Sequence, residues 1–252
     1  MTPNHKIIIE DNPKRLAARA AEFFALKARR TVEKKGRFLA ALSGGSTPRS
    51  MNRLLAEEPL ISEIPWGETH LYWVDERCVS ENDEASNYGA AKRDFLDRVP
   101  MPAEQIHPMP GEMVPEEGAR QYRDLLRDLF KLDRGQFPIF DLIFLGIGAD
   151  GHTASLFPGQ GALDERVRSV VAVKGGNPDV SRLTLTYPVL NRGAQIVFLV
   201  SGRGKAGILQ TIFESGETHL PAQRISPVDG TLTWLIDRDA AALLSKGVTH
   251  GD

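Results

Sequence analysis

The sequence predicts an α/β fold, with one domain across residues 1–252 and a largely parallel sheet that carries helices on both faces. Apolar runs of strand length alternate along the chain with segments whose apolar residues recur at helical spacing. This alternation is typical of parallel strands joined by covering helices. The chain has 252 residues and is 41% hydrophobic, which is enough for one large core.

Local sequence signals place the individual elements. The first helix is expected after Asn12-Pro13, because asparagine caps helices and proline fits the first turn. Thr47-Pro48 predicts the start of another helix, and a long polar loop is expected to run through Asn87. The remaining periodic segments predict strands at 6–10, 37–42, 69–74, 140–145, 168–173, 182–187, 195–200 and 232–236, and helices at 115–132, 205–213 and 237–246.

The charges and the single cysteine exclude several classes of function. With 31 basic and 33 acidic side chains the net charge is −2, so no global positive field favours nucleic acid or an anionic membrane. Cys78 alone cannot form a disulfide or a thiolate cluster, and it fits a reducing compartment. No membrane span or signal peptide is apparent. We therefore expect a soluble cytoplasmic protein, a monomer or small homo-oligomer, that binds a small molecule.

Two loops that follow predicted strands have the composition of anion sites. In parallel sheets ligands bind beyond the carboxyl ends of the strands. Gly44, Gly45, Ser46 and Thr47 follow one strand and open a helix, so glycine permits close approach while hydroxyls and free N–H groups donate. Lys205 lies at a second helix start of the same design. Each alone would be an ordinary turn, but two in one sheet favour a phosphorylated ligand.

The segment GIGADGH, residues 146–152, fits two incompatible interpretations. Its glycines match the dinucleotide fingerprint, which also needs an acidic residue about 20 positions later to bind ribose. Lys174 follows the next predicted strand instead. Asp150 would also face the pyrophosphate of such a cofactor and repel it. We therefore expect no nicotinamide cofactor.

The same loop carries a candidate acid/base pair, Asp150 and His152, around Gly151. Histidine titrates near neutrality and can take a proton from water. One histidine after a strand is more often structural, but beside two anion loops we expect it to be the base. The carboxylate could orient the ring, raise its pKa or hold a substrate hydroxyl. The other histidines lack such surroundings, and no set of residues has metal-ligand spacing.

A third polar loop begins with Asp75-Glu-Arg77. A salt-bridged loop is its ordinary interpretation. Alternatively, Arg77 donates to a carbonyl, carboxylate or phosphate of a ligand, while Asp75 binds a hydroxyl or fixes the arginine.

Five motifs together resemble the family of glucosamine-6-phosphate isomerases and 6-phosphogluconolactonases, and within it the lactonases. They are LSGGSTP, WVDERCVSENDEASNYG, FDLIFLGIGADGHTASLFPG, SRLTLTYPVLN and PAQRISPVDGTLTWLID, in order across nearly the whole chain. The resemblance implies a Rossmann-like fold and hydrolysis of 6-phospho-D-glucono-1,5-lactone to 6-phospho-D-gluconate in the oxidative pentose phosphate pathway. It implies no metal and no organic cofactor.

The resemblance also implies residue roles. His152 is the expected general base and Asp150 its neighbour at the reacting end. The substrate-binding residues are expected to be Gly44, Gly45, Ser46, Thr47, Asp75, Arg77, Gly151, Lys174, Arg182 and Lys205. Which of the cations binds the phosphate and which the lactone end stays open.

Two alternatives remain. The deaminase relatives carry a glutamate five positions after the loop histidine as part of an acid/base relay, whereas this chain has Phe157 there. The second alternative is the sugar-phosphate-sensing domain of a transcriptional regulator, which would follow a helix-turn-helix. Only a few residues precede the first predicted strand here, which argues against the sensor.

Overall fold

The computed structural model describes residues 5–216 and 219–249. Its centre is a seven-stranded sheet in the order β1-β10-β9-β6-β2-β3-β5, in which every neighbouring pair is parallel. The α/β class and the largely parallel sheet are thereby confirmed. The strands are β1 His5–Glu10, β2 Phe38–Leu42, β3 Thr69–Trp73, β5 Ile106–His107, β6 Leu142–Leu145, β9 Gln195–Val200 and β10 Thr231–Asp237.

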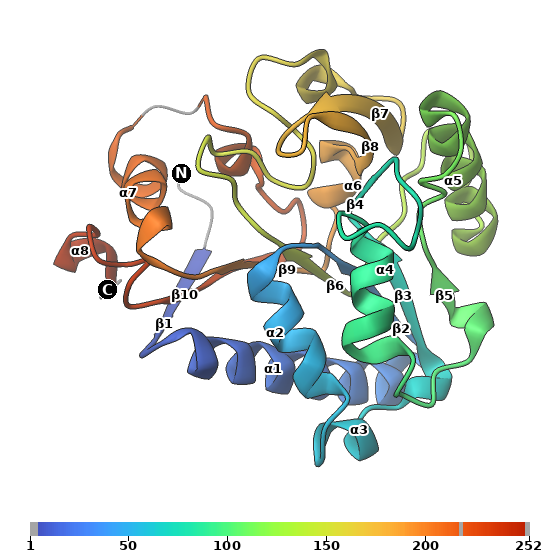
Figure 1. Cartoon of the computed structure of the whole chain (residues 1–252), viewed down its shortest axis with the longest axis horizontal. Helices are drawn as coiled ribbons and strands as arrows, with labels where there is room; N and C mark the ends of the chain where they lie inside the picture. Colours follow the sequence, from blue (N-terminus) through green and yellow to red (C-terminus); the bar gives the residue numbers. More distant parts are fainter. Residues whose placement is uncertain (1–4, 217–218, 250–252) are drawn as a thin grey trace.

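Helices cover both faces of this sheet. In Figure 1, α1 and α2 lie below the strands, whereas α5, α6 and the β7–β8 hairpin lie above them. The Asn12 side chain accepts from two N–H groups of the first turn of α1, as expected, and Gly36 ends that helix with φ 73°. The helices are α1 Pro13–Lys35, α2 Ser46–Leu55, α3 Leu60–Glu63, α4 Asn87–Ala91, α5 Pro115–Phe130, α6 Tyr187–Leu190, α7 Ala206–Glu214 and α8 Lys246–Thr249.

A second, smaller sheet corrects part of the sequence prediction. Its order is β4-β8-β7, and both pairs are antiparallel. The runs at 168–173 and 182–187 therefore belong not to the parallel sheet but to a hairpin of β7 Val170–Gly175 and β8 Val180–Leu185. The four residues between them cannot form a crossover helix, so the strands must be antiparallel. The expected polar loop also contains a third strand, β4 Asp75–Arg77.

The prediction of a helix at 237–246 is wrong. Asp237 instead ends β10, and its buried carboxylate accepts hydrogen bonds from the Ser201 hydroxyl and the Gly202 and Ala240 backbone N–H groups. The bonds from Ser201 and Gly202 hold the end of β10 beside the loop after β9. A short helix, α8, follows only at Lys246–Thr249.

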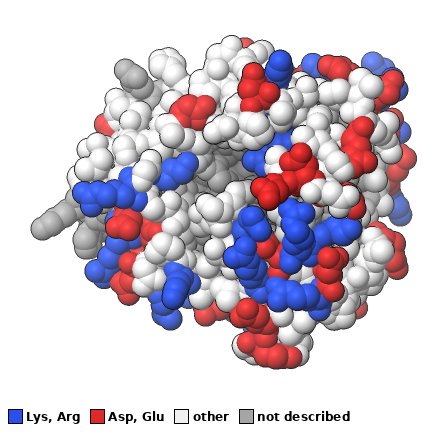
Figure 2. All heavy atoms as spheres, viewed as in Figure 1, with Lys and Arg blue, Asp and Glu red and all other residues white. Residues whose placement is uncertain are grey.

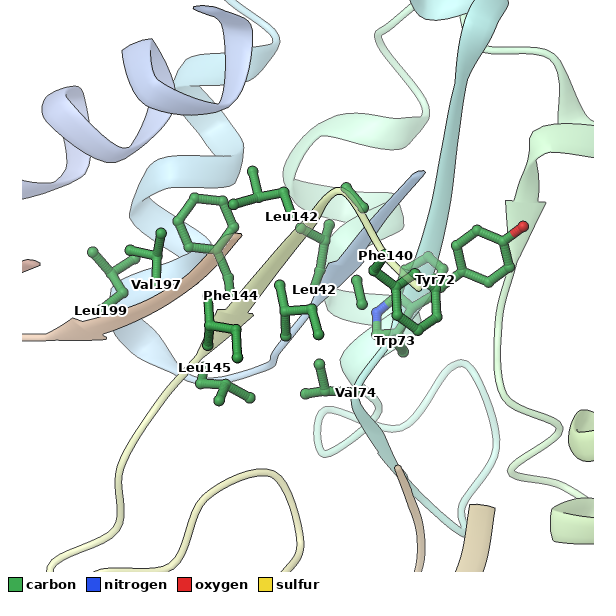
Figure 3. Close-up of a cluster of buried hydrophobic side chains, with 14 of the residues drawn as sticks. Leu42, Tyr72, Trp73, Val74, Phe140, Leu142, Phe144, Leu145, Val197 and Leu199 are labelled. Carbon is green, nitrogen blue, oxygen red and sulfur yellow. The ribbon is translucent and has the colours of Figure 1, made fainter. Parts of the chain in front are cut away.

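Strand β6 lies at the centre of the apolar core. All its residues are buried, because a parallel strand with helices on both faces has no solvent side. Figure 3 shows Phe144 of β6 among Leu142, Val197 and Leu42 from its own and neighbouring strands. Most of the buried apolar residues of the described chain form one contiguous cluster.

We expect Phe144→Ala to lower the free energy of unfolding by about 3–5 kcal/mol, because it leaves a cavity in a core that cannot collapse fully. Phe144 is 0% exposed. Urea unfolding followed by circular dichroism measures the change. Val167→Ala is the control, since Val167 is 81% exposed, and should change stability by less than about 0.5 kcal/mol. Similar losses in the two variants would contradict this account of the core.

Candidate active site

A cavity of about 500 Å³ opens at the carboxyl ends of β2, β6 and β9, beside β4 and β8. Figure 2 shows this face of the molecule hollowed near its centre. The volume suits a small-molecule ligand. Its lining residues are Ser43, Gly44, Gly45, Ser46, Thr47, Pro48, Asp75, Arg77, Asn87, Gly146, Ile147, Gly148, Ala149, His152, Ala154, Gly176, Asn177, Arg182, Leu199, Val200, Ser201 and Lys205.

The start of α2 forms one wall of the cavity. Thr47 was expected to cap this helix, but the helix begins at Ser46 with Gly45 as its N-cap, and no side chain caps it. Gly45 has φ 104°, a conformation that favours glycine. A Cβ on Gly44 would overlap the side-chain amide of Asn87. The uncapped N–H groups of the first turn therefore border the cavity, where they can donate to an anion.

His152 and Asp150 form a hydrogen-bonded pair at the second wall. The imidazole Nδ1 lies 2.6 Å from Asp150 Oδ1, which also accepts from the His152 backbone N–H at 3.1 Å. Burial acts to raise the pKa of Asp150, but these bonds and the adjacent imidazole hold it below its ordinary value. Of the three roles considered for the carboxylate, this geometry fits orientation of the ring. Asp150 does not bond Nε2, and the His152 ring borders the cavity.

The cavity also contains three cations that have only neutral partners. Arg77 donates to the Ala85 carbonyl and the Asn87 side chain, Arg182 to the Gly175 and Pro178 carbonyls, and Lys205 to the Ile147 carbonyl, each at 2.6–3.1 Å. Within residues 5–216 and 219–249, none of the three forms an ion pair. Buried charges are normally paired.

The pKa values of two of these cations are lowered, in each case mainly by burial. Burial lowers the pKa of Lys205, although the nearby Asp150 carboxylate acts in the opposite direction. Burial also lowers the pKa of Arg182, and so does Arg77, which lies directly opposite it in the β4–β8 pair. A dianion bound in the cavity would supply the charge that the protein does not.

Asp75 does not bond Arg77 directly. Its carboxylate accepts from the Ser155 hydroxyl at 2.6 Å and from the Asn87 amide at 3.3 Å, not from Arg77. The Asn87 side-chain oxygen accepts from Arg77 instead. Asn87 therefore links the carboxylate to the guanidinium, and sequence reasoning missed it because nothing in a polar loop marks which amide turns inward.

The structure brings together nine of the predicted site residues. Gly44, Gly45, Ser46, Thr47, Asp75, Arg77, His152, Arg182 and Lys205 line the cavity, and Asp150 is attached through His152. Gly151 does not line the cavity; it packs against Leu220, whose Cδ2 atom would lie 2.9 Å from a Cβ at this position. Lys174 is exposed and does not line the cavity. Val173, not Lys174, pairs with Arg182 in the hairpin, so strand alternation turns Lys174 to the other face.

Two further observations describe the part of the chain that the structure covers. It contains no group of three His, Cys, Asp or Glu side chains placed to hold a metal ion. No helix there combines the length and apolar composition needed to cross a membrane.

Residues 11–234 match the model of the family described as glucosamine-6-phosphate isomerases/6-phosphogluconolactonase. The chain belongs to this family. It is 40% identical over 244 residues to the 6-phosphogluconolactonase of a Synechocystis strain, an alignment that covers 95% of this chain and 98% of the relative. These matches confirm the predicted family and the prediction that the protein is an enzyme of that family.

Solved structures of the family agree with the architecture. The 6-phosphogluconolactonase of Trypanosoma cruzi has a TM-score of 0.84 and 27% identity, covering 97% of this chain and 98% of its own. A monomeric glucosamine-6-phosphate deaminase has a TM-score of 0.79, covering 94% of this chain and 99% of its own. At 21% identity that likeness shows the fold alone. The fold therefore does not separate lactonase from deaminase.

Buried Glu76 organises the loop that carries Arg77 and Asn87. Its two carboxylate oxygens accept from the backbone N–H groups of Arg77, Asn87 and Tyr88 at 2.7–2.8 Å, and from the Ser86 hydroxyl. Burial raises the pKa of Glu76 although these N–H groups act to lower it. The carboxylate is thus the acceptor around which the loop folds.

We expect Glu76→Gln to destabilise the protein by about 2–3 kcal/mol, because the amide replaces one acceptor oxygen with a donor facing other donors. Glu76 is 2% exposed. Urea unfolding gives the stability of the variant, and Glu84→Gln at an exposed position of the same loop is the control. Stability equal to that of the control would mean that Glu76 does not order the loop.

Proposed function

We propose that this chain hydrolyses 6-phospho-D-glucono-1,5-lactone to 6-phospho-D-gluconate, with His152 as the general base, in the oxidative pentose phosphate pathway. The observation that carries the proposal is the pairing of His152 with Asp150 at a cavity whose three cations hydrogen-bond only neutral groups among the described residues. A base and a dianion site are what hydrolysis of a phosphorylated lactone requires. Membership in the family supports the same substrate.

The chemistry follows from the orientation of His152. Asp150 accepts at Nδ1, so Nε2 takes a proton from a water molecule while the water oxygen attacks C1 of the lactone. The carbonyl becomes a tetrahedral oxyanion, and its collapse breaks the bond between C1 and the ring oxygen. The imidazolium returns its proton to that leaving oxygen. Ionised Asp150 stabilises the imidazolium between the two transfers.

We assign the phosphate to the start of α2 and to Lys205. Helix α2 packs against β9, and Lys205 follows β9, so these two anion-binding features lie on neighbouring elements. Ser46 and Thr47 supply first-turn N–H groups there, after the close turn at Gly44 and Gly45. Arg77 and Arg182 would then bind either the second negative charge of the phosphate or the lactone end. Asp75 would bind a hydroxyl group of the sugar.

The reaction needs no resident metal or organic cofactor on chemical grounds. A lactone contains its own leaving group, so a positioned base and charge stabilisation are sufficient in kind.

The single-domain organisation is also proposed, supported by one contiguous core among the described residues. A cytoplasmic location and a monomer or small homo-oligomer remain expectations.

Deamination of an amino-sugar phosphate is less well supported. The residue five positions after His152 is Phe157, which has no group to relay a proton. A sensor domain would bind a sugar phosphate without turnover, so an assay of lactone hydrolysis above the spontaneous rate separates it from the enzyme.

We expect His152→Ala to lower kcat by roughly 10²-fold or more with little change in KM, the usual scale for losing a general base. Initial rates of lactone hydrolysis, corrected for the spontaneous reaction, measure both constants. His70→Ala is the control, because His70 is also partly exposed but lies outside the cavity. Full activity in a folded His152→Ala protein would remove this residue from the mechanism.

Lys205→Ala should reduce kcat/KM for the phosphorylated lactone by about one to two decades, since a lost charge-assisted contact is worth roughly 1.5–3 kcal/mol. For unphosphorylated gluconolactone the same change should matter little. Lys34→Ala, on exposed helix surface, is the matched control. An equal loss on both substrates would mean that Lys205 serves the lactone end or the fold, and the phosphate assignment would be wrong.

A further inference from the structure

Phe157 is an apolar side chain enclosed by charged and titratable groups of the cavity. It is 6% exposed and follows the loop that carries His152. Its ring centroid lies 4.8 Å from that of the His152 imidazole, with 53° between the planes. The Arg182 Cζ atom lies 5.6 Å from the same ring centroid. The ring therefore contacts both the proposed base and a buried cation.

The turn of the β7–β8 hairpin closes over this ring through two glycines. A Cβ on Gly176 would lie 3.0 Å from Phe157 Cζ, and one on Gly175 would lie 3.2 Å from Cδ2. Both glycines have positive φ, 149° and 88° in chain order. Gln160 also ties this segment to β7 by donating to the Lys174 carbonyl at 2.7 Å. The ring is thus held from several sides.

The imidazole needs a second constraint besides Asp150. The bond at Nδ1 fixes one atom of the ring, but the plane can still tilt about that contact, and the direction of Nε2 tilts with it. The Phe157 ring packs against the imidazole and limits this tilt. General-base catalysis depends steeply on such orientation.

The Arg182 guanidinium also needs a further contact to fix its position. Among the residues that the structure describes Arg182 forms no ion pair, and two backbone carbonyls bind its guanidinium at Nε and Nη2. The Phe157 ring provides the remaining contact, a cation–π interaction. One rigid ring therefore sets the separation between the base and the cation.

We propose that Phe157 is a positioning residue, whose ring fixes the tilt of His152 and holds Arg182 at a set distance from it. The kinetic part rests on the proposed lactonase function, whereas the geometric part does not. Phe157 itself has no polar atom and takes no part in proton transfer.

The kinetic test compares Phe157→Leu, which keeps most of the apolar volume without the flat ring, with Phe157→Ala. We expect kcat for the phosphorylated lactone to fall about 10- to 100-fold in Phe157→Ala and at least about threefold in Phe157→Leu. In a His152→Ala background the further loss should be smaller, because only the part that acts through Arg182 remains. Phe213→Ala, a partly buried phenylalanine against Trp234 and outside the cavity, controls for general loss of packing. Wild-type kcat in Phe157→Leu, or an undiminished loss without His152, would overturn the proposal.

A crystal structure of Phe157→Leu tests the geometry without any assay. The imidazole should tilt away from its wild-type orientation, and the Arg182 guanidinium should shift toward the vacated space. Unchanged positions of both groups would refute the positioning role. If the wild-type protein failed to hydrolyse the lactone, the proposed function would fall, but this comparison would still decide whether Phe157 positions the two side chains.

Discussion

Strands β2 and β6 lie side by side at the centre of the sheet, although β3, β4, β5 and α5 separate them in sequence. From β2 the chain continues through β3 to β5 at one edge, and from β6 through β9 toward the other. The loops that leave two such neighbouring strands diverge and open a crevice between them. The turn at Gly44 and the loop of His152 border that crevice, so the chemistry is located by the strand order.

Charge is distributed unevenly around this crevice. The two acidic side chains nearest to it on β4, Asp75 and Glu76, are buried, and their hydrogen bonds come from hydroxyl, amide and backbone donors. They thus shape the loop and form no direct ion pair with the cations among the described residues, although both act to raise the pKa of Arg182. The carboxylates position Arg77, through its backbone N–H and through Asn87, whereas backbone carbonyls bind the Arg182 guanidinium.

Much of this arrangement was predictable from sequence, and the exceptions have physical causes. Strand β9 has the predicted bounds, Gln195–Val200, because a buried run between polar residues is unambiguous. The loops after β2 and β6 were predicted to form the ligand site, because each is a polar, glycine-rich segment that follows an apolar strand. Strand β4 was not predictable, since its Asp-Glu-Arg sequence is buried only through tertiary hydrogen bonds. Asp237 misled in the same way, because its partners include Ser201 and Gly202 in the loop after β9.

The placement of Lys174 and Asn87 shows where sequence reasoning ends for the site. Lys174 follows a predicted strand, but that strand belongs to a hairpin in which its side chain faces away from the cavity. Asn87 reaches the site because Gly44 leaves room for its amide. Both outcomes depend on how separate segments pack against each other, which no local pattern encodes.

Because Arg77 and Arg182 lie opposite each other, binding of an anion between them would change the thermal stability of the protein. Like charges directly across an antiparallel pair repel each other. Burial lowers the pKa of Arg182 most, and the charge of Arg77 lowers it further. An anion that bridges them removes the repulsion in the native state and finds no such site in the unfolded chain. Any ligand of this kind raises the melting temperature with its concentration. If an anion such as phosphate binds there, the resistance of this protein to heat would depend partly on the buffer around it.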